Sequence, residues 1–454
     1  MSSEADRQRV LIFGAGRVSG PVVEHLSNNP HIDLTIVSFV KAELTRAQSI
    51  CPKASLVQLD ITVDSTQRDE LIKTADIAVG LVPCHLTEIL AEMCLKYNTN
   101  LVMASYVSDK IQKLHERAKS AGLTFLCEMG LDPGIDHMLA VRAIDQIRDR
   151  GGKVTSYELW CGGLPAPECA NNPLQYKFSW YPRGALESCQ REAGYLHEGQ
   201  VVKIPGGGSQ VLERYEDAKF QSQFKLEGYP NEFHSSYLKL YNIESVDTFI
   251  RGTLRYKGFC SVVIAMMKLG LFSEEKHSLL LETGPDITWK SFIANAVGLG
   301  KDVTNEELDQ AVVKQIGGDD STLSAIKSMG FLDDIPIAKT GTPLDCLAGY
   351  LEKKLAYGPG ERDLVVMHIE VSAEYPDSTR ERTDIDLVVF GEAGGHSAMA
   401  KTVGYTIGTA VQLILEGKIT EKGVVIPVTR GIYNLVLPAL EEKGISVKQN
   451  TVKL

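Results

Sequence analysis

The sequence predicts an α/β protein with a doubly wound parallel sheet, followed by an α+β domain that carries a helical insertion. Short apolar runs alternate with amphipathic stretches through the first 130 residues. Strand patterns then mix with loops rich in Gly and Pro, and a later block has helical periodicity instead. We therefore expect a first domain over residues 1–131, a second over 132–253 and 362–454, and a helical insertion over 254–361.

The first domain has six expected strands. They occupy residues 10–13, 33–37, 55–59, 77–82, 101–105 and 123–127. The stretches between them, such as residues 87–95, are amphipathic and are expected to be helices. Because right-handed crossovers place such helices on both faces of a sheet, the strands should form one parallel sheet.

The rest of the chain changes pattern twice. A strand is expected over residues 155–161, before a loop rich in Gly and Pro that is typical of loops lining sites. Residues 261–270 have the pattern of a helix that stops at a glycine. Residues 364–371 and 384–390 alternate again and predict a hairpin with its turn around Pro376.

Composition excludes several classes of protein. Lys and Arg total 47 against 58 Asp and Glu, and the net charge of −11 would repel nucleic acid. No apolar run approaches the roughly 18 residues of a membrane span. The nine cysteines contain no C-x-x-C pair, which is typical of reduced thiols, and we expect no metal site. Residues 1–6 lack a leader pattern, so the cytoplasm is the expected location.

A glycine turn follows the first expected strand and precedes a helix. Its glycines let the backbone approach a pyrophosphate, whose charge the helix N-terminus stabilises. Ser19 replaces the third glycine of the usual fingerprint. An ordinary βα turn is the alternative, but the place at the first of six alternating strands favours dinucleotide binding. The predicted cofactor-binding residues of the turn are Gly14, Ala15, Gly16, Arg17 and Val18.

The choice between NAD and NADP stays open. The second strand ends at Ser38 without the acid that binds a ribose 2′-hydroxyl, and Lys41 can serve a phosphate or begin the next helix. Asp60 closes the third strand, where an adenine contact and a helix cap are both plausible. The cofactor-binding residues predicted at strand ends are Ser38, Asp60, Ile61, Val82, Ala104, Ser105, Leu131 and Asp132.

Three further segments place polar groups where strands end. Ser105 and Tyr106 follow the fifth strand, and Asp132 follows the sixth, so they should border the ligand crevice of the sheet. Cys161 opens the Gly-rich loop. The alternatives are a helix cap for Asp132 and a small buried hydrophobe for Cys161.

Long motifs in the chain resemble the glutamate-forming saccharopine dehydrogenase (saccharopine reductase) family. The similarity runs from residue 9 to the C-terminus and is far more specific than the glycine turn. It implies a Rossmann domain, a substrate domain and a helical insertion. The motifs occupy residues 131–134, 161–168, 172–174, 176–180, 251–256 and 397–404.

The resemblance implies NAD(P)-dependent oxidation of the secondary amine of saccharopine to an imine. Water then releases 2-aminoadipate 6-semialdehyde and L-glutamate, and the reverse is a reductive condensation in lysine metabolism. It also implies that Tyr106, Asp132 and Cys161 are catalytic groups around the amine. A carboxylate or thiol with a raised pKa can take the amine proton, and which group does so stays open. The implied substrate-binding residues are Ser105, Tyr106, Asp132, Phe178, Asn231, Thr253, Leu254 and Arg255.

One position departs from the family pattern. The family has Asn-Arg-Asp-Ser after Tyr-Pro, and its Arg binds a substrate carboxylate. This chain has Glu232 in place of the Arg, directly after Asn231. The nearest motif cations able to pair with the carboxylates of saccharopine are therefore Arg255, Arg251 and Lys177.

Two other functions remain as alternatives. One is a relative that couples another amine and aldehyde, such as a carboxynorspermidine-type dehydrogenase. The other is a non-catalytic NAD(P)-sensing regulator, against which the retention of Asp132 and Cys161 argues. A mitochondrial location is the alternative if the chain is part of a longer fused precursor, because animals and plants carry a similar region behind a lysine-ketoglutarate reductase domain. The sequence leaves pathway direction and oligomeric state open, with a homodimer as one alternative.

Overall fold

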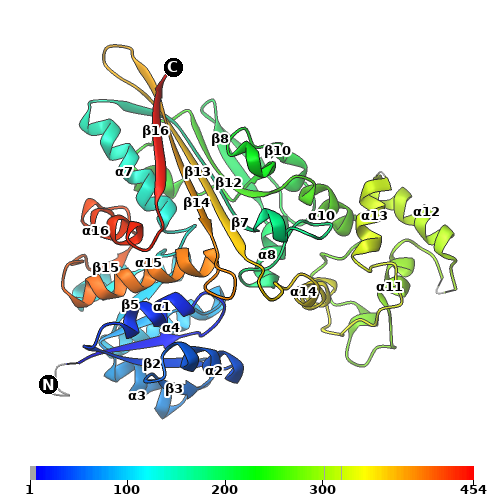
Figure 1. The fold of residues 1–454 in the computed structure, drawn as a ribbon, viewed down its shortest axis with the longest axis horizontal. Helices are drawn as coiled ribbons and strands as arrows, with labels where there is room; N and C mark the ends of the chain where they lie inside the picture. Colours follow the sequence, from blue (N-terminus) through cyan, green and yellow to red (C-terminus); the bar gives the residue numbers. More distant parts are fainter. Residues whose placement is uncertain (1–6, 301, 319) are drawn as a thin grey trace. The chain divides into compact units, whose positions relative to one another are not determined.

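The computed structural model describes residues 7–300, 302–318 and 320–454 (Figure 1). Residues 1–6, on which the expectation of no targeting leader depends, lie outside the described residues. The chain divides into two compact units, each described separately below. Unit 1 comprises Met1–Val154, Ser236–Glu244 and Ile369–Leu454, and unit 2 comprises Thr155–Ser235 and Ser245–His368.

The core of unit 1 is a seven-stranded parallel sheet, which confirms the predicted doubly wound fold. The strand order is β15-β6-β5-β4-β1-β2-β3, and each neighbouring pair is parallel. Figure 1 colours the N-terminal strands of this sheet blue to cyan. The strands are β1 Gln8–Phe13, β2 Ile32–Ser38, β3 Ser55–Gln58, β4 Ile77–Gly80, β5 Asn100–Met103, β6 Thr124–Leu126 and β15 Gly423–Val425.

Six of these strands match the six predicted ones. The seventh, β15, comes from the C-terminal part of the chain and was not predicted. It pairs with β6 in parallel, with Gly423 opposite Thr124. Residues 369–454 therefore share unit 1 with the N-terminal block, while the division into three domains stays a prediction.

Helices cover the sheet of unit 1, and the long C-terminal helix α15 packs against α1 (Figure 1). Gly404 of α15 makes this close approach feasible, because a Cβ there would lie 3.0 Å from Pro21 Cβ and from the Val18 carbonyl oxygen. The helices are α1 Gly20–Ser27, α2 Lys41–Ile50, α3 Thr66–Thr74, α4 Cys84–Tyr97, α5 Asp109–Gln112, α6 His115–Ser120, α7 Ile135–Asp149, α9 Ser236–Leu240, α15 Ala398–Leu415 and α16 Arg430–Glu441.

The predicted hairpin near Pro376 is present. Its strands are β13 Asp363–Glu374, which begins in unit 2 and ends in unit 1, and β14 Arg380–Phe390. At the turn, the Ser378 amide donates to the Tyr375 carbonyl over 2.9 Å. The last strand, β16 Val447–Lys453, pairs with β14 in the antiparallel direction.

Unit 2 contains the mixed sheet of the predicted α+β domain. Its strands follow the order β10-β11-β12-β7, where β12 is parallel to β7 and antiparallel to β11. The strand β8 pairs with β12 and with β9. The bounds are β7 Lys153–Pro165, β8 Ala193–His197, β9 Gln200–Ile204, β10 Glu216–Asp217, β11 Leu226–Pro230 and β12 Thr248–Tyr256.

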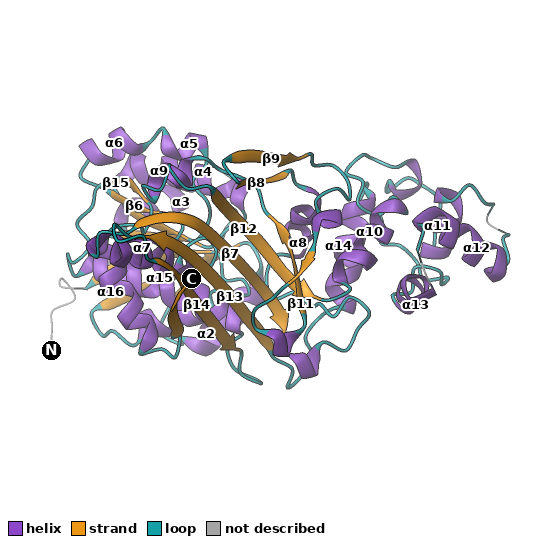
Figure 2. Ribbon diagram, turned by 90° about the horizontal axis from the view of Figure 1, so that it is seen from above, coloured by secondary structure: helices purple, strands orange, loops and turns teal. Residues whose placement is uncertain are grey.

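The predicted helical block is also confirmed, and Figure 2 shows its helices in purple. Trp289 lies at the centre of their core, with its ring centroid 5.3 Å from Phe331 and 5.2 Å from Tyr350. The helices of unit 2 are α8 Pro182–Glu187, α10 Phe259–Lys268, α11 Trp289–Ala296, α12 Asn305–Ile316, α13 Asp320–Ser328 and α14 Pro343–Lys354. The short 3₁₀ helices are Pro167–Cys169, Ser188–Gln190, Leu212–Arg214, Ser222–Phe224 and Ser278–Leu280.

Two expectations from composition can be compared with the described part of the chain. None of the nine cysteines forms a disulfide there. Among the described residues, no helix combines the length and the apolar character needed to cross a membrane.

Candidate active site

The carboxyl ends of five neighbouring strands of unit 1 lie side by side along one end of the sheet. These strands, β6-β5-β4-β1-β2, are adjacent and parallel, so the residues that follow them lie in a row. The chain order reverses between β1 and β4, and doubly wound sheets bind ligands at such a switch point. Most of the predicted cofactor residues follow these strands. Asp60 and Ile61 follow the next strand, β3.

The glycine turn after β1 has the geometry expected of a pyrophosphate-binding turn. Gly14 has a φ of +96°, and a Cβ there would lie 2.2 Å from the Leu81 carbonyl oxygen. Only glycine fits such a position without strain. The buried Ser19 donates its hydroxyl to the Gly16 carbonyl over 2.9 Å, and α1 begins at Gly20 with no acidic residue in its first turn. The helix N-terminus therefore presents a positive end to a phosphate.

Helix α2 brings one cation and one anion to this turn. Arg46 donates through Nη2 to the carbonyl oxygens of Ala15 and Gly16, over 2.6 and 2.7 Å. Glu43 accepts the Ser38 hydroxyl over 2.7 Å, and its other oxygen lies 3.5 Å from the position of a Cβ on Gly16. Sequence analysis missed Glu43, although an acid in the first turn after β2 was a usable indication.

The three predicted cofactor residues that follow β3 and β4 are Asp60, Ile61 and Val82. Asp60 accepts from the Thr62 amide over 2.9 Å and from the Thr62 hydroxyl over 2.7 Å. These bonds hold the pKa of the Asp60 carboxyl below its ordinary value. Ile61 is buried and Val82 half-buried. Asp60 thus organises the turn after β3, and its adenine contact stays a prediction.

Tyr106 and Asp132, which follow the neighbouring strands β5 and β6, meet. The Tyr106 hydroxyl donates to Asp132 Oδ1 over 3.0 Å. Tyr106 is 44% exposed and Asp132 is half-buried, so the pair is accessible at the sheet edge. Gly134 is the N-cap residue of α7, so Asp132 does not cap that helix. Ala104 and Ser105 directly precede Tyr106, and the buried Leu131 precedes Asp132.

A buried polar network lies behind this pair. Glu128 is 2% exposed, and its Oε1 accepts the Val107 amide over 3.0 Å. Its Oε2 lies 2.7 Å from His137 Nε2 and accepts the Tyr237 hydroxyl over 3.2 Å. His137 Nδ1 lies 2.5 Å from the Tyr241 hydroxyl. Sequence analysis gave these residues no role, although a carboxylate directly after β6 was a usable indication.

Unit 2 brings three other predicted residues together. The parallel pairing of β7 with β12 places Cys161 opposite Thr253. The Thr253 hydroxyl donates to Asn231 Oδ1 over 2.6 Å, and Cys161 is 7% exposed. Leu254 is completely buried, and a Cβ on Gly162 would lie 2.8 Å from Leu254 Cβ. Leu254 therefore packs in the core of unit 2.

Arg255 is a buried cation inside an aromatic cage. Its guanidinium carbon lies 5.0 Å from the ring of Tyr176, 5.1 Å from Phe259 and 5.8 Å from Tyr229. Such contacts stabilise a desolvated cation. Within the described part of the chain its Nε has no hydrogen-bond partner. Phe178, also buried, packs edge-on against Tyr176.

The other cations named from the sequence differ from Arg255. Lys177 is ion-paired with Glu361, with Nζ and Oε2 2.6 Å apart, so its charge is already neutralised. Arg251 is buried at 6% exposure. Glu232, the departure from the family pattern, is half exposed and lies 3.6 Å from His234.

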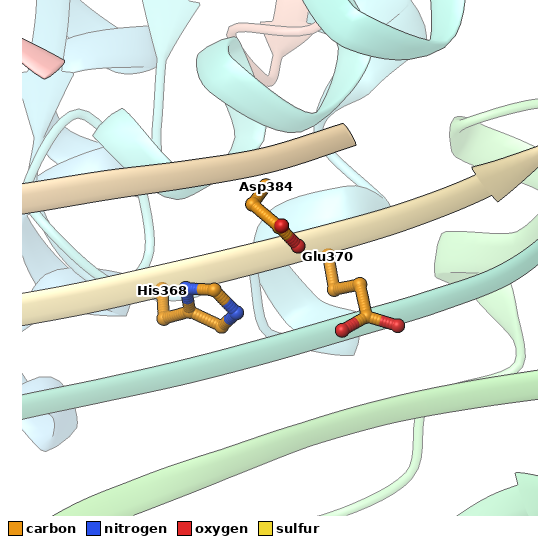
Figure 3. A group of neighbouring side chains, drawn as sticks. All are labelled: His368, Glu370 and Asp384. Atoms are coloured by element: carbon orange, nitrogen blue, oxygen red, sulfur yellow. The ribbon is translucent and has the colours of Figure 1, made fainter. Parts of the chain in front are cut away.

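Side chains able to bind a metal gather at His368 and Glu370 of β13 and Asp384 of β14 (Figure 3). Arg382 Nε lies 3.0 Å from Asp384 Oδ1 and 3.7 Å from Glu370 Oε2. Because the Arg382 guanidinium already pairs with both carboxylates, we do not infer a metal site from this cluster.

The chain is similar to known proteins along its whole length. The family model of the saccharopine dehydrogenase NADP binding domain matches residues 10–126, and that of the saccharopine dehydrogenase C-terminal domain matches residues 130–445. The chain is 37% identical to the "Alpha-aminoadipic semialdehyde synthase, mitochondrial" of Bos taurus, over 100% of this chain and 49% of the relative. It therefore spans about half the length of the mammalian relatives that it matches.

A fungal relative matches this chain over nearly the whole length of both proteins. The "Saccharopine dehydrogenase [NADP(+), L-glutamate-forming]" of Saccharomyces cerevisiae is 32% identical over 98% of this chain and 99% of the relative. The solved apo structure of the histidine-tagged L-Glu-forming saccharopine dehydrogenase from that yeast superposes with a TM-score of 0.88, covering 98% of this chain and 100% of that chain. With two family models that cover most of its length, the chain belongs to the saccharopine dehydrogenase family.

Proposed function

We propose that the chain catalyses the NAD(P)-dependent oxidation of saccharopine to 2-aminoadipate 6-semialdehyde and L-glutamate, or the reverse condensation. The observation that carries the proposal is the hydrogen-bonded Tyr106–Asp132 pair at the carboxyl edge of a sheet with a pyrophosphate-binding turn. Full-length similarity to a yeast relative named for this reaction supports the choice of substrate.

The Asp132 carboxylate performs the proton transfer in this proposal. A hydride can leave the carbon next to nitrogen only when the nitrogen lone pair is available to form the C=N bond, so the amine must be neutral. Asp132 takes the amine proton, and the Tyr106 hydrogen bond keeps its carboxylate oriented toward that position. Bound dinucleotide supplies the acceptor for the hydride. Water then adds to the imine carbon, and cleavage of the C–N bond releases the aldehyde and the amino group of glutamate.

The glycine turn and the N-terminus of α1 would bind the dinucleotide. Gly14 gives the backbone access, and the first turn of α1 stabilises the pyrophosphate charge. Glu43, which accepts the Ser38 hydroxyl, and Arg46, which donates to the Ala15 carbonyl, would face the ribose of either cofactor. The proposal includes both NAD and NADP.

Residues of unit 2 would bind the carboxylates of the substrate. Arg255 is the strongest candidate, because a carboxylate would satisfy its Nε and offset the cost of burying the cation. Thr253 and Asn231 add polar groups opposite Cys161. Cys161 is a second proton-transfer candidate.

The proposal is tested by absorbance at 340 nm with the purified chain, saccharopine and each dinucleotide in parallel. We expect saccharopine-dependent reduction of at least one dinucleotide, and a kcat at least ~10²-fold lower for Asp132→Asn. The control is Asp286→Asn, which removes an exposed carboxylate of unit 2. Reduction with a carboxylated polyamine but not with saccharopine would favour the carboxynorspermidine-type alternative. Tight NADPH binding without any turnover would favour a regulator.

Location and assembly are further parts of the proposal. We propose a cytoplasmic location, with the mitochondrion as the alternative suggested by the names of the mammalian relatives. Fractionation of the cells that express the chain distinguishes the two compartments. A homodimer is one alternative for the assembly, and sedimentation velocity distinguishes it from a monomer.

A further inference from the structure

One buried residue holds the backbone on both sides of Tyr106. The Glu128 amide donates to the Ser105 carbonyl over 3.2 Å, and the Glu128 carboxylate accepts the Val107 amide over 3.0 Å. Ser105 and Val107 are the two sequence neighbours of Tyr106. The position of the Tyr106 side chain therefore depends on where Glu128 lies.

The Glu128 side chain is itself held firmly. A carboxylate at 2% exposure is costly to bury unless donors surround it. His137 supplies one donor at 2.7 Å and Tyr237 a second at 3.2 Å. On the other side of the ring, His137 Nδ1 lies 2.5 Å from the Tyr241 hydroxyl and 3.9 Å from Asp136 Oδ2, so the imidazole is held at both nitrogens. Two side chains thus contact the carboxylate directly, and Tyr241 holds one of them, His137, from its other side.

The backbone of Glu128 points to a requirement for its side chain. Its φ is +58°, in the left-handed region that glycine adopts at little cost. A glycine would relieve the backbone but would leave Val107 and His137 without the carboxylate. The chain keeps a glutamate at a position that favours glycine.

We propose that Glu128 is a positioning residue for Tyr106. Through its amide and its carboxylate it fixes the segment that carries Tyr106, so that the phenol stays hydrogen-bonded to Asp132. His137, with Tyr241, holds the Glu128 carboxylate in place. The catalytic consequence of this role depends on the proposed function, whereas the effect on the Tyr106 phenol does not.

Glu128→Gln is the test variant, because the amide keeps the size of the side chain while one oxygen becomes a donor. The NH₂ group then faces either the Val107 amide or His137 Nε2, so the variant loses at least one of the contacts that hold the carboxylate. Glu24→Gln is the matched control. Glu24 also pairs with a histidine in unit 1, with its Oε2 2.6 Å from His396 Nε2, but it belongs to α1 and has no bond to the segment around Tyr106.

The first measurement needs no turnover. In protein with ¹³Cζ-labelled tyrosine, the Tyr106 resonance is assigned as the one that Tyr106→Phe removes. We expect Glu128→Gln to shift this resonance and its titration, and Glu24→Gln to leave both unchanged. An unchanged Tyr106 resonance in folded Glu128→Gln protein would overturn the proposal. If Glu128→Gln does not fold, His137→Gln, which leaves Glu128 in place, is expected to shift the Tyr106 resonance, and an unchanged resonance in folded His137→Gln protein would overturn the proposal.

The second measurement is a double-mutant cycle on kcat with saccharopine. Glu128→Gln should lower kcat about 10-fold with Tyr106 present, and less than about 2-fold in the Tyr106→Phe background. KM for the dinucleotide should not change. An equal loss in both backgrounds would show that Glu128 acts independently of Tyr106, contrary to the proposal. A wild-type chain that does not oxidise saccharopine refutes the proposed function, and the NMR result then decides the positioning role by itself.

Discussion

The contact between α1 and α15 can be tested with two glycine substitutions of the same kind. Gly404→Ala adds a methyl group on α15 where Pro21 Cβ and the Val18 carbonyl oxygen would each lie 3.0 Å away. Gly349→Ala adds the same methyl group on α14, where no atom lies within 4 Å. Both glycines lie in the interior of a helix.

Both variants gain the helix propensity of alanine, but only Gly404→Ala also overpacks a helix contact. Alanine in place of glycine stabilises an exposed helix interior by about 0.5–1 kcal/mol, so Gly349→Ala should raise the free energy of unfolding by that amount. At Gly404 the same gain is opposed by overpacking against backbone, which costs about 1–3 kcal/mol. We expect Gly404→Ala to be destabilising by about 1 kcal/mol. Since Val18 belongs to the glycine turn, dinucleotide binding should also weaken about 3-fold, or ~0.7 kcal/mol.

The two units can be followed separately. All three tryptophans, at positions 160, 180 and 289, belong to unit 2, so their fluorescence reports the unfolding of that unit. Hydrogen exchange of peptides from α1 and α15 reports unit 1. Gly349→Ala should raise the midpoint of the fluorescence unfolding transition and leave hydrogen exchange in α1 and α15 unchanged. Gly404→Ala should lower the protection of α1 and α15 against hydrogen exchange. Equal stabilisation by both variants would refute the close packing of the two helices.

Three further results are expected. Asp132→Ala should lower kcat by at least ~10²-fold and Cys161→Ser by less, as measured at 340 nm, since only the first removes the carboxylate beside Tyr106. Glu361→Gln should cost about 2 kcal/mol in urea unfolding, because Lys177 stays buried without its counter-ion. Hydrogen bonds from Lys177 lower the pKa of Glu361 in the folded protein. The difference in free energy of unfolding between the wild type and Glu361→Gln should therefore be largest above the ordinary Glu pKa of about 4.3, and it should vanish as the pH falls through the lowered pKa of the folded state. Glu43→Gln should raise kcat/KM for NADP relative to NAD by about 10-fold, because it removes a negative charge near the expected ribose phosphate.

Local patterns were sufficient to predict most of the parallel sheet. Each of the first six strands is a short apolar run bounded by turns, and the hydrophobic pattern specifies it without reference to the rest of the chain. The seventh strand, β15, is as short as β6, with three residues each, but β6 continues the alternation of strands and helices in the first block, whereas β15 lies far outside that block. It becomes a strand because it pairs with β6, which is a tertiary contact.

The candidate site was predictable to the extent that it depends on strand ends. Tyr106 and Asp132 were expected at one edge because parallel neighbouring strands end together, and the structure brings them together. The family resemblance is confirmed by the matches along the chain. The partnership of His137 with Tyr241 could not be predicted, because the two residues are 104 positions apart and Tyr241 follows a five-residue helix with little pattern of its own.

The late arrival of β15 matters during synthesis on the ribosome. The strand β6 is complete at residue 126, but its partner emerges about 300 residues later. At about 5–20 residues per second, the growing chain waits roughly 15 to 60 s with that edge of the sheet uncovered. An open edge strand is a template for pairing with other chains. During synthesis, the β6 edge of this sheet therefore stays open to pairing with other chains until residues 423–425 have been made and can cover it.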